Sequence, residues 1–349
     1  MKTPGTAALT AEPAAEAQRV RSFEAIDAAK FKQQVESVYQ PAILRQLVGD
    51  WPAVAAARQS ADSISSYLGQ RDNGVRIRAF LGHEGIKGRY FYEPGAEGFN
   101  FTPAETTLTN LLGTLRDPAE ASRSIYMGST ATSKMLPSFA SENPLRIATD
   151  RGGEPRIWIG NASRVAPHYD EADNIACVVS GRRRFILFPP EQVANLYVGP
   201  LDRTVAGQPI SMVDLDNPDF ERFPKFREAL KHVLVADLEP GDAIYIPALW
   251  WHAVQATGEL NVLVNYWWNE APPDAGSPIH ALGHGLLTIS HLPEAKRRAW
   301  RVLFDHYVFR LNGDPAEHIP VAARGIIGRS TPELRRMIKQ FLMRALSSH

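Results

Sequence analysis

The 349-residue sequence contains a single cysteine, Cys177, so no disulfide can form within the chain. Lys plus Arg and Asp plus Glu number 38 each, so no net charge attracts nucleic acid or an acidic membrane surface. No apolar run reaches the roughly 18 residues that a membrane span requires. From these absences we expect a cytoplasmic protein that binds neither nucleic acid nor membrane.

Three regions of the chain differ in composition. Residues 1–20 are rich in Ala, Pro and Thr and lack a long apolar segment, which predicts a disordered tail rather than a signal peptide. Residues 21–271 are expected to form the main domain, and residues 272–349 a helical region. The segment "TPELRRMIKQFLMRAL" carries an apolar stripe that needs a partner surface, either its own domain or a second copy of the chain.

The middle of the chain predicts a compact antiparallel β-structure. Segments such as "NIACVVSG", "RRFILFPP" and "LNVLVNYWWN" are short, β-branched or aromatic, and separated by Gly, Pro and Asp turns. That spacing is typical of a barrel or a double-sheet jelly roll. Ahead of it, "SFEAIDAAKFKQQVESVYQ" shows a helical pattern, followed by a short apolar strand. The predicted fold class is therefore mainly β, with helices and a C-terminal helical region.

The stretch "APHYDEADN" gathers several groups that can bind a metal ion. His168 and Asp170 are two residues apart, so on an extended strand both side chains point to one face. Further along, "PGDAIYIPALWWH" leads through a turn and a strand to His252. Two histidines and one carboxylate on a β-scaffold are the ligand set of non-haem Fe(II) oxygenases, although zinc can also use these ligands.

The chain resembles the JmjC-like, cupin-8 family of 2-oxoglutarate oxygenases, and within it most closely the asparaginyl hydroxylases. Five segments carry the resemblance in order: "HYDEADN", "GRRRFILFPPEQ", "DLDNPDFERFPKF", "PGDAIYIPALWWH" and "VNYWWN". The resemblance implies a double-stranded β-helix core, Fe(II) as cofactor and 2-oxoglutarate as co-substrate. It also implies a hydroxylase that couples decarboxylation of 2-oxoglutarate to succinate with hydroxylation of a substrate C–H bond, and a homodimer formed through the C-terminal helices.

The resemblance also assigns residues. It implies that the metal ligands are His168, Asp170 and His252. Tyr126 matches a tyrosine that contacts the distal carboxylate of 2-oxoglutarate. The other residues expected around the co-substrate are Asn174, Arg183, Asn265 and Trp267.

Three positions depart from the family pattern, and the first is Gly128, which stands where the resembled hydroxylases have a glutamine near the peptide substrate. Arg183 stands where the family usually has a lysine that pairs with 2-oxoglutarate, and strand alternation sends its side chain to the same face as Phe185. An inward arginine can bind a carboxylate through two hydrogen bonds. Val165 stands where the resembled hydroxylases have a threonine, so one hydroxyl contact worth about 1 kcal/mol is missing.

The substrate remains open, as either a peptide side chain or a small molecule. Two other functions also remain. A metal-dependent cupin enzyme that works without 2-oxoglutarate would be favoured if Arg183 faced outward. A binding protein that kept the fold and lost turnover is the third candidate, although a complete triad of unused ligands inside a barrel would be costly.

Overall fold

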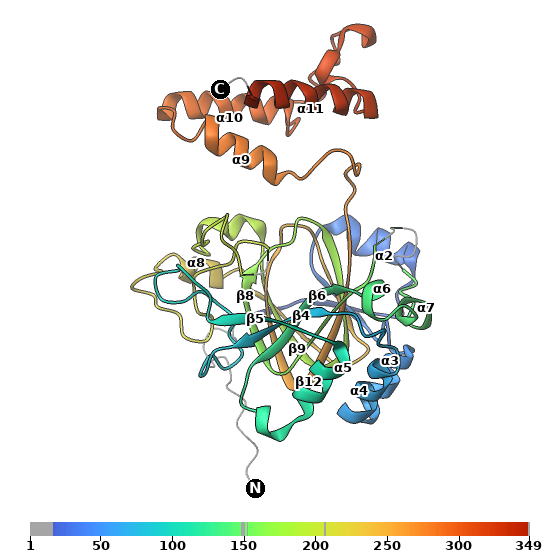
Figure 1. Cartoon of the computed structure of the whole chain (residues 1–349). Helices are drawn as coiled ribbons and strands as arrows, with labels where there is room; N and C mark the ends of the chain where they lie inside the picture. The colour runs from blue at the N-terminus through green and yellow to red at the C-terminus, as the bar shows by residue number, and fades with distance from the viewer. Residues whose placement is uncertain (1–16, 148–150, 152, 206, 348–349) are drawn as a thin grey trace. The chain divides into compact units, whose positions relative to one another are not determined.

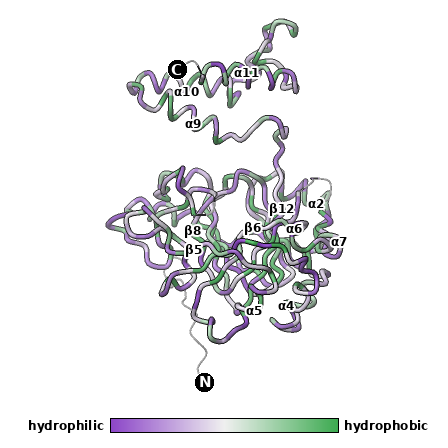
Figure 2. The backbone as a smooth tube through the Cα atoms, in the orientation of Figure 1, coloured by the Kyte–Doolittle hydropathy of each residue, from purple (hydrophilic) through white to green (hydrophobic). Residues whose placement is uncertain are grey.

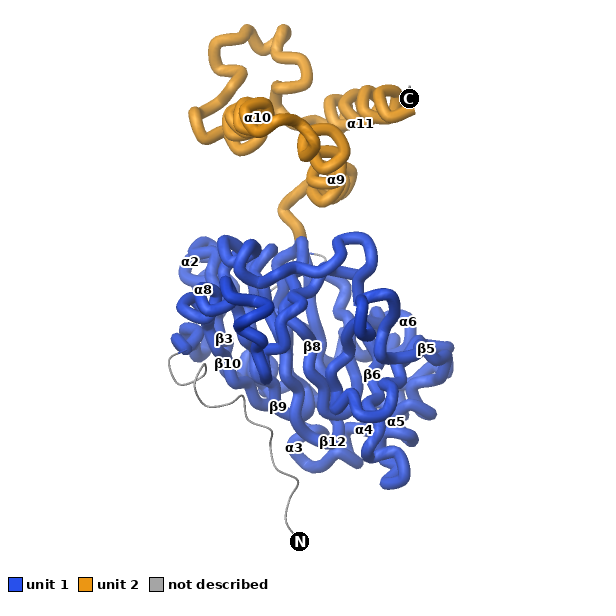
Figure 3. Tube along the Cα trace, turned by 90° about the vertical axis from the view of Figure 1, so that its left-hand side faces the viewer, with its two compact units in different colours: residues 1–268 blue, residues 269–349 orange. Residues whose placement is uncertain are grey.

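The computed structural model describes residues 17–147, 151, 153–205 and 207–347. Most of the tail predicted for residues 1–20 lies outside these ranges. The chain divides into two compact units, the first ending at Trp268 and the second beginning at Asn269 (Figure 3).

The first unit contains twelve strands in one sheet system and seven α-helices among the described residues (Figure 1). The strands are β1 (Gln18–Arg19), β2 (Arg21–Glu24), β3 (Ala42–Arg45), β4 (Ile77–Gly82), β5 (Phe101–Thr106), β6 (Ile125–Ala131), β7 (Arg156–Gly160), β8 (Ser163–His168), β9 (Asp173–Phe188), β10 (Leu234–Leu238), β11 (Ala243–Ile246) and β12 (Trp251–Trp268). The helices are α2 (Ala28–Gln34), α3 (Pro52–Gln59), α4 (Ala61–Gly69), α5 (Leu108–Arg116), α6 (Thr132–Met135), α7 (Phe139–Glu142) and α8 (Phe226–Leu230).

Two long strands, β9 and β12, pair with each other and belong to both faces of the core. The first part of β9 pairs with β11 and its last part pairs with β10. The first part of β12 pairs with β8 and its last part pairs with β7. Each long strand therefore passes from one sheet into the other, which is how a jelly roll is closed. The predicted β-core with helices is confirmed.

The continuous apolar runs of β9 and β12 follow from burial on both faces. Cys177 and Val264 face outward against helices α3, α4 and α5, in a cluster that includes Trp51 and Leu68. The neighbouring Val178 faces the interior of the barrel. Hydrophobic segments accordingly gather where the strands cross in the first unit (Figure 2). Cys177 is fully buried in this packing, as expected for a structural thiol.

One segment differs from the sequence-based expectation. The helical pattern predicted from residue 22 begins instead with strand β2, which pairs in parallel with β3, and the helix α2 starts only at Ala28. Asp27 caps that helix by accepting a hydrogen bond from the backbone N–H of Lys30 at 2.8 Å. Pairing with a buried neighbouring strand thus overrides the helical pattern of the preceding residues.

The second unit is helical, with α9 (Ile279–Thr288), α10 (Glu294–Tyr307) and α11 (Pro332–Ser347). None of these three helices contains a buried residue. The most exposed apolar side chains of this unit include Val321, which is 79% exposed, and Phe341, which is 61% exposed. Within its described residues this unit therefore lacks a hydrophobic core of ordinary size.

None of the helices in the described ranges combines the length and apolar character that crossing a bilayer requires.

Gly181 provides a test of how β9 bends between the two sheets. Its φ is +75°, and a Cβ there would lie 2.0 Å from Asn261 Oδ1. We expect Gly181→Ala to lower the free energy of unfolding by about 1–3 kcal/mol, because both the backbone and the side-chain contact become strained. Urea denaturation measures the change.

The matched control is Gly113→Ala in helix α5, where a Cβ would meet no atom within 4 Å. We expect this variant to be stabilised by about 0.5 kcal/mol. Equal stability of Gly181→Ala and the wild type would contradict the role given to this bend.

Candidate functional site

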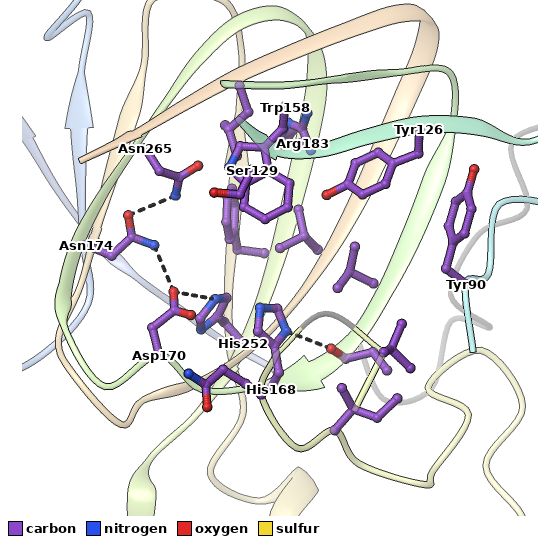
Figure 4. Close-up of a pocket in the computed structure, with 18 of the residues that line it drawn as sticks. Tyr90, Tyr126, Ser129, Trp158, His168, Asp170, Asn174, Arg183, His252 and Asn265 are labelled. Atoms are coloured by element: carbon purple, nitrogen blue, oxygen red, sulfur yellow. Dashed lines mark hydrogen bonds and ion pairs between the residues drawn. The ribbon is translucent and has the colours of Figure 1, made fainter. Parts of the chain in front are cut away.

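A cavity of about 230 Å³ lies inside the barrel, between strands β6, β7, β8, β9 and β12. Val205, Gln208 and Ile210, from the insertion between β9 and β10, also line it. The eight residues assigned to the site from the sequence all line this one cavity: His168, Asp170, His252, Tyr126, Asn174, Arg183, Asn265 and Trp267 (Figure 4). Residues separated by up to 141 positions in the sequence are thus brought together.

The three predicted metal ligands lie at one end of the cavity. His168 ends β8, and His252 lies opposite it in the β8–β12 pairing. The two imidazole rings are 4.2 Å apart between centroids, and His252 Nε2 is 3.8 Å from Asp170 Oδ2. The backbone carbonyl of Asp170 accepts a hydrogen bond from Leu249 N at 2.8 Å, which ties the loop after β8 to the start of β12.

Backbone contacts orient both histidines. His168 Nδ1 lies 3.0 Å from the carbonyl oxygen of Ala166, and His252 Nδ1 lies 3.0 Å from that of Trp250. A carbonyl can only accept, so each Nδ1 carries the proton and each Nε2 keeps its lone pair for a metal. Burial lowers the pKa of His252, and the neighbouring His168 lowers it further, while Asp170 opposes the shift. The neutral imidazole that metal binding requires is therefore favoured.

Asp170 is held by two side chains from the long strands. Trp267 Nε1 donates to Asp170 Oδ2 at 3.0 Å, and Asn174 Nδ2 lies 3.4 Å from the same oxygen. Asn265 Nδ2 in turn donates to Asn174 Oδ1 at 2.8 Å. Such supporting hydrogen bonds fix a ligating carboxylate and are typical of metal sites.

Two imidazole nitrogens and one carboxylate suit a divalent metal ion, although the three side chains do not stand at the spacing of a metal-bound site. No three histidine, cysteine or acidic side chains stand at metal-ligand spacing in the described part of the chain. The assignment therefore depends on the orientation of both imidazoles and on the hydrogen bonds to Asp170. Asp173 belongs to a different contact, since it accepts from Tyr245 Oη at 2.7 Å.

A buried cation lies elsewhere in the wall of the same cavity. Arg183 is only 6% exposed, and its Nε has no hydrogen-bond partner among the described residues. Burial lowers the pKa of Arg183 to about 10, which leaves it protonated at neutral pH. Burial raises the pKa of Tyr126, so its hydroxyl stays a donor. These groups can bind an anion.

The neighbours of Arg183 in β9 confirm the alternation expected from the sequence. Arg182 and Arg184 point away from the cavity and form ion pairs with Glu239 and Asp237. Phe185 returns to the cavity wall beside Arg183. An outward Arg183 would favour a cupin enzyme that works without 2-oxoglutarate, whereas the side chain of Arg183 lines the cavity.

Four further cavity residues with hydrogen-bonding side chains were missed from the sequence. Their signals were weak: Trp158 and Ser129 lie in apolar strands that resemble core, whereas Tyr90 and Gln208 lie in irregular segments. Gln208 reaches the site because the insertion returns to β8. Ile210 forms a β-bridge with His168, and Ser211 N donates to Pro167 O at 2.7 Å.

Residues 28–274 match the family described as a cupin-like domain. Human HSPB1-associated protein 1 is 28% identical over 251 residues, which cover 68% of this chain and 49% of that protein. The tRNA wybutosine-synthesizing protein 5 of Gallus gallus is 34% identical over 145 residues, 37% of this chain and 42% of that protein. Lysine-specific demethylase JMJ31 of Arabidopsis thaliana is 38% identical over 113 residues, 32% of this chain and 20% of that protein. The chain spans about half the length of these relatives or less.

The hydrogen bond from Trp267 to Asp170 provides a test of the metal site. Trp267→Phe removes the N–H donor and keeps an aromatic ring, so the carboxylate loses one of its supports. We expect the affinity for Co(II) to fall about tenfold or more. Titration calorimetry with Co(II) measures it.

Trp268→Phe is the control, because Trp268 follows in the same strand but does not line the cavity. Unchanged Co(II) affinity in Trp267→Phe, or an equal loss in both variants, would argue against the proposed support of Asp170.

Proposed function

The chain belongs to the JmjC-like family of cupin-like domains, and on that premise we propose that it is an Fe(II)- and 2-oxoglutarate-dependent oxygenase. The observation that carries the proposal is the buried Arg183 in the same cavity as His168, Asp170 and His252. A buried guanidinium without an anionic partner is costly, and a bound carboxylate removes that cost.

In this proposal the two functions of the cavity are divided between its residues. His168, Asp170 and His252 would hold Fe(II) through two imidazole nitrogens and one carboxylate. Arg183 and Tyr126 would hold the distal carboxylate of 2-oxoglutarate, the arginine through its charge and the tyrosine through its hydroxyl. Asn174 and Asn265 keep Asp170 in place.

Iron(II), when bound, supplies the oxygen chemistry that couples decarboxylation of 2-oxoglutarate to succinate with hydroxylation of a substrate C–H bond. The protein binds and orients both reactants and limits access of water. A cavity of about 230 Å³ is smaller than the roughly 300 Å³ at which ligand pockets usually begin. It suits the small co-substrate and the reacting group of a substrate, so most of a peptide or small-molecule substrate would lie outside it.

The co-substrate assignment is tested by binding. Anaerobic Fe(II)-loaded wild type should bind 2-oxoglutarate in titration calorimetry. Arg183→Ala should weaken this binding by about tenfold or more, because a charge-assisted contact is worth about 1.5–3 kcal/mol. Arg183→Lys keeps the charge and should recover part of the affinity.

Each other outcome favours a different function. A wild type that binds metal but no 2-oxoglutarate would indicate a metal cupin enzyme of another kind. A wild type that binds neither would indicate a protein that kept the fold without turnover. Release of succinate from 2-oxoglutarate, dependent on Fe(II) and lost in His252→Ala, would support the oxygenase directly.

We also propose that the protein is a homodimer formed through its C-terminal helices. Helix α11 carries the predicted apolar stripe, and Met337, Phe341 and Leu342 of that stripe are each at least 40% exposed. Leu303 and Tyr307 of α10 are likewise exposed. Because the described residues of the second unit form no core of ordinary size, burial of these side chains against a second copy would stabilise it.

The dimer is tested by light scattering coupled to size exclusion at micromolar concentration. We expect a mass of two chains for the wild type and of one chain for Phe341→Glu, since a charge in an apolar interface is strongly unfavourable. Gln340→Glu changes the charge equally at the neighbouring position and should remain dimeric. A monomeric wild type would show that the apolar face is covered in another way.

A further inference from the structure

Buried polar atoms without partners concentrate at the cavity. Among the described residues, seven buried side-chain nitrogen or oxygen atoms lack a hydrogen-bond partner. Four of them belong to cavity residues: Tyr90 Oη, Trp158 Nε1, Arg183 Nε and Asn265 Oδ1. Leaving such a group unpaired costs about 1–3 kcal/mol, so their gathering around one cavity indicates a ligand that pairs with them. Three of the four can donate a hydrogen bond, which favours an anionic ligand.

Trp158 is one of these donors, and two aromatic side chains hold its ring. It lies in β7 opposite Leu263 of β12. Its ring stacks on Tyr126 with centroids 5.9 Å apart and an interplanar angle of 25°. Trp267 makes an edge contact with the same indole, with ring centroids 6.2 Å apart. Packing between two aromatic side chains fixes the direction of the indole N–H, which cannot turn to water without breaking both contacts.

The cavity wall next to Trp158 is formed largely by apolar side chains of β8, β9 and β12. Val165 in β8 packs onto the same apolar cluster as Trp158, together with Phe185 and Leu263. Its side chain supplies no hydroxyl. An indole N–H is a donor only, so it suits a carboxylate and cannot serve a ligand that itself donates.

We propose that the indole N–H of Trp158 donates a hydrogen bond to the distal carboxylate of 2-oxoglutarate, beside the contacts from Arg183 and Tyr126. Trp158 thereby adds a neutral donor to a part of the wall where the Val165 side chain has none. This inference rests on the proposed co-substrate. Figure 4 shows Trp158, Arg183 and Tyr126 at the same end of the cavity, whereas the hydroxyl of Tyr90 points in a different direction from that of Tyr126. Tyr90 is therefore not part of the proposed contact.

The experiment compares two ligands and two tryptophans. Trp158→Phe removes the N–H and keeps an aromatic ring to stack on Tyr126. Trp268→Phe is the matched control, because Trp268 Nε1 is also buried without a partner and its ring also stacks on a tyrosine, Tyr245, but it does not line the cavity. The ligands are 2-oxoglutarate and 2-oxobutyrate, which keeps the metal-chelating 2-oxo acid but has no distal carboxylate.

Dissociation constants are measured by calorimetry on anaerobic Fe(II)-loaded full-length protein. For 2-oxoglutarate we expect Trp158→Phe to bind about tenfold more weakly than wild type, the loss of one hydrogen bond to a charged group. For 2-oxobutyrate the two proteins should bind alike, and Trp268→Phe should match wild type for both ligands. Adding Val165→Thr to Trp158→Phe should restore much of the affinity, because a hydroxyl then returns to the same wall.

Three results would overturn the proposal. Equal binding of 2-oxoglutarate by Trp158→Phe and wild type would show that the N–H makes no such contact. An equal loss for both ligands would show a general disturbance of packing. A wild type that binds no 2-oxoglutarate would remove the proposed function together with this inference, whereas the first two results leave the proposed function intact.

Discussion

The antiparallel pairing of β9 with β12 determines the rest of the site. The pairing runs from Trp251 opposite Phe188 to Trp268 opposite Asp173. Five of the eight predicted site residues lie on these two strands: Asn174, Arg183, His252, Asn265 and Trp267. Side chains alternate between the two faces of a strand, so a shift of one residue in this register would turn either Arg183 on β9 or His252 on β12 out of the cavity. The register is held mainly by apolar side chains, which are buried on both faces of the two strands. The packing that stabilises the core is therefore the same packing that sets the geometry of the site.

The cavity combines two electrostatic environments within a small volume. At one end, two imidazoles and a carboxylate are oriented by carbonyl oxygens, by an indole and by amides. At the other, a buried guanidinium lies beside a tyrosine that burial keeps protonated. Low dielectric strengthens each of these interactions and makes each unpaired group more costly. A ligand with a chelating group at one end and an anionic group at the other would pair with the groups at both ends of the cavity. A 2-oxo dicarboxylate has this chemical form.

Much of the core and of the site was predictable because both depend on local periodicity. Alternation along β9 was sufficient to place Arg183 inward and Arg184 outward. The strand expected to carry His168 and Asp170 ends at His168, so the position of Asp170 depends instead on the loop that Leu249 N holds. The contact between Asn174 and Asn265 joins residues 91 positions apart and depends on strand register, which no local pattern encodes. Gln208 lies in an insertion whose path is set by its bridge to β8. The helical pattern around Phe23 failed because parallel pairing with β3 was the stronger constraint.

The two units differ in what keeps them folded. The first unit buries large side chains on both faces of its long strands, so its structure follows from its own sequence. In the described part of the second unit, apolar side chains such as Leu287 and Met343 are 65% and 67% exposed. Helices of this length gain most of their stability from packing an apolar face, so this unit needs a surface that its own residues do not supply. All eight site residues precede Asn269 and lie in the unit that needs no such surface. The proposed association and the proposed co-substrate binding therefore depend on different physical interactions, and a change in one apolar helix face would leave the residues of the cavity in place.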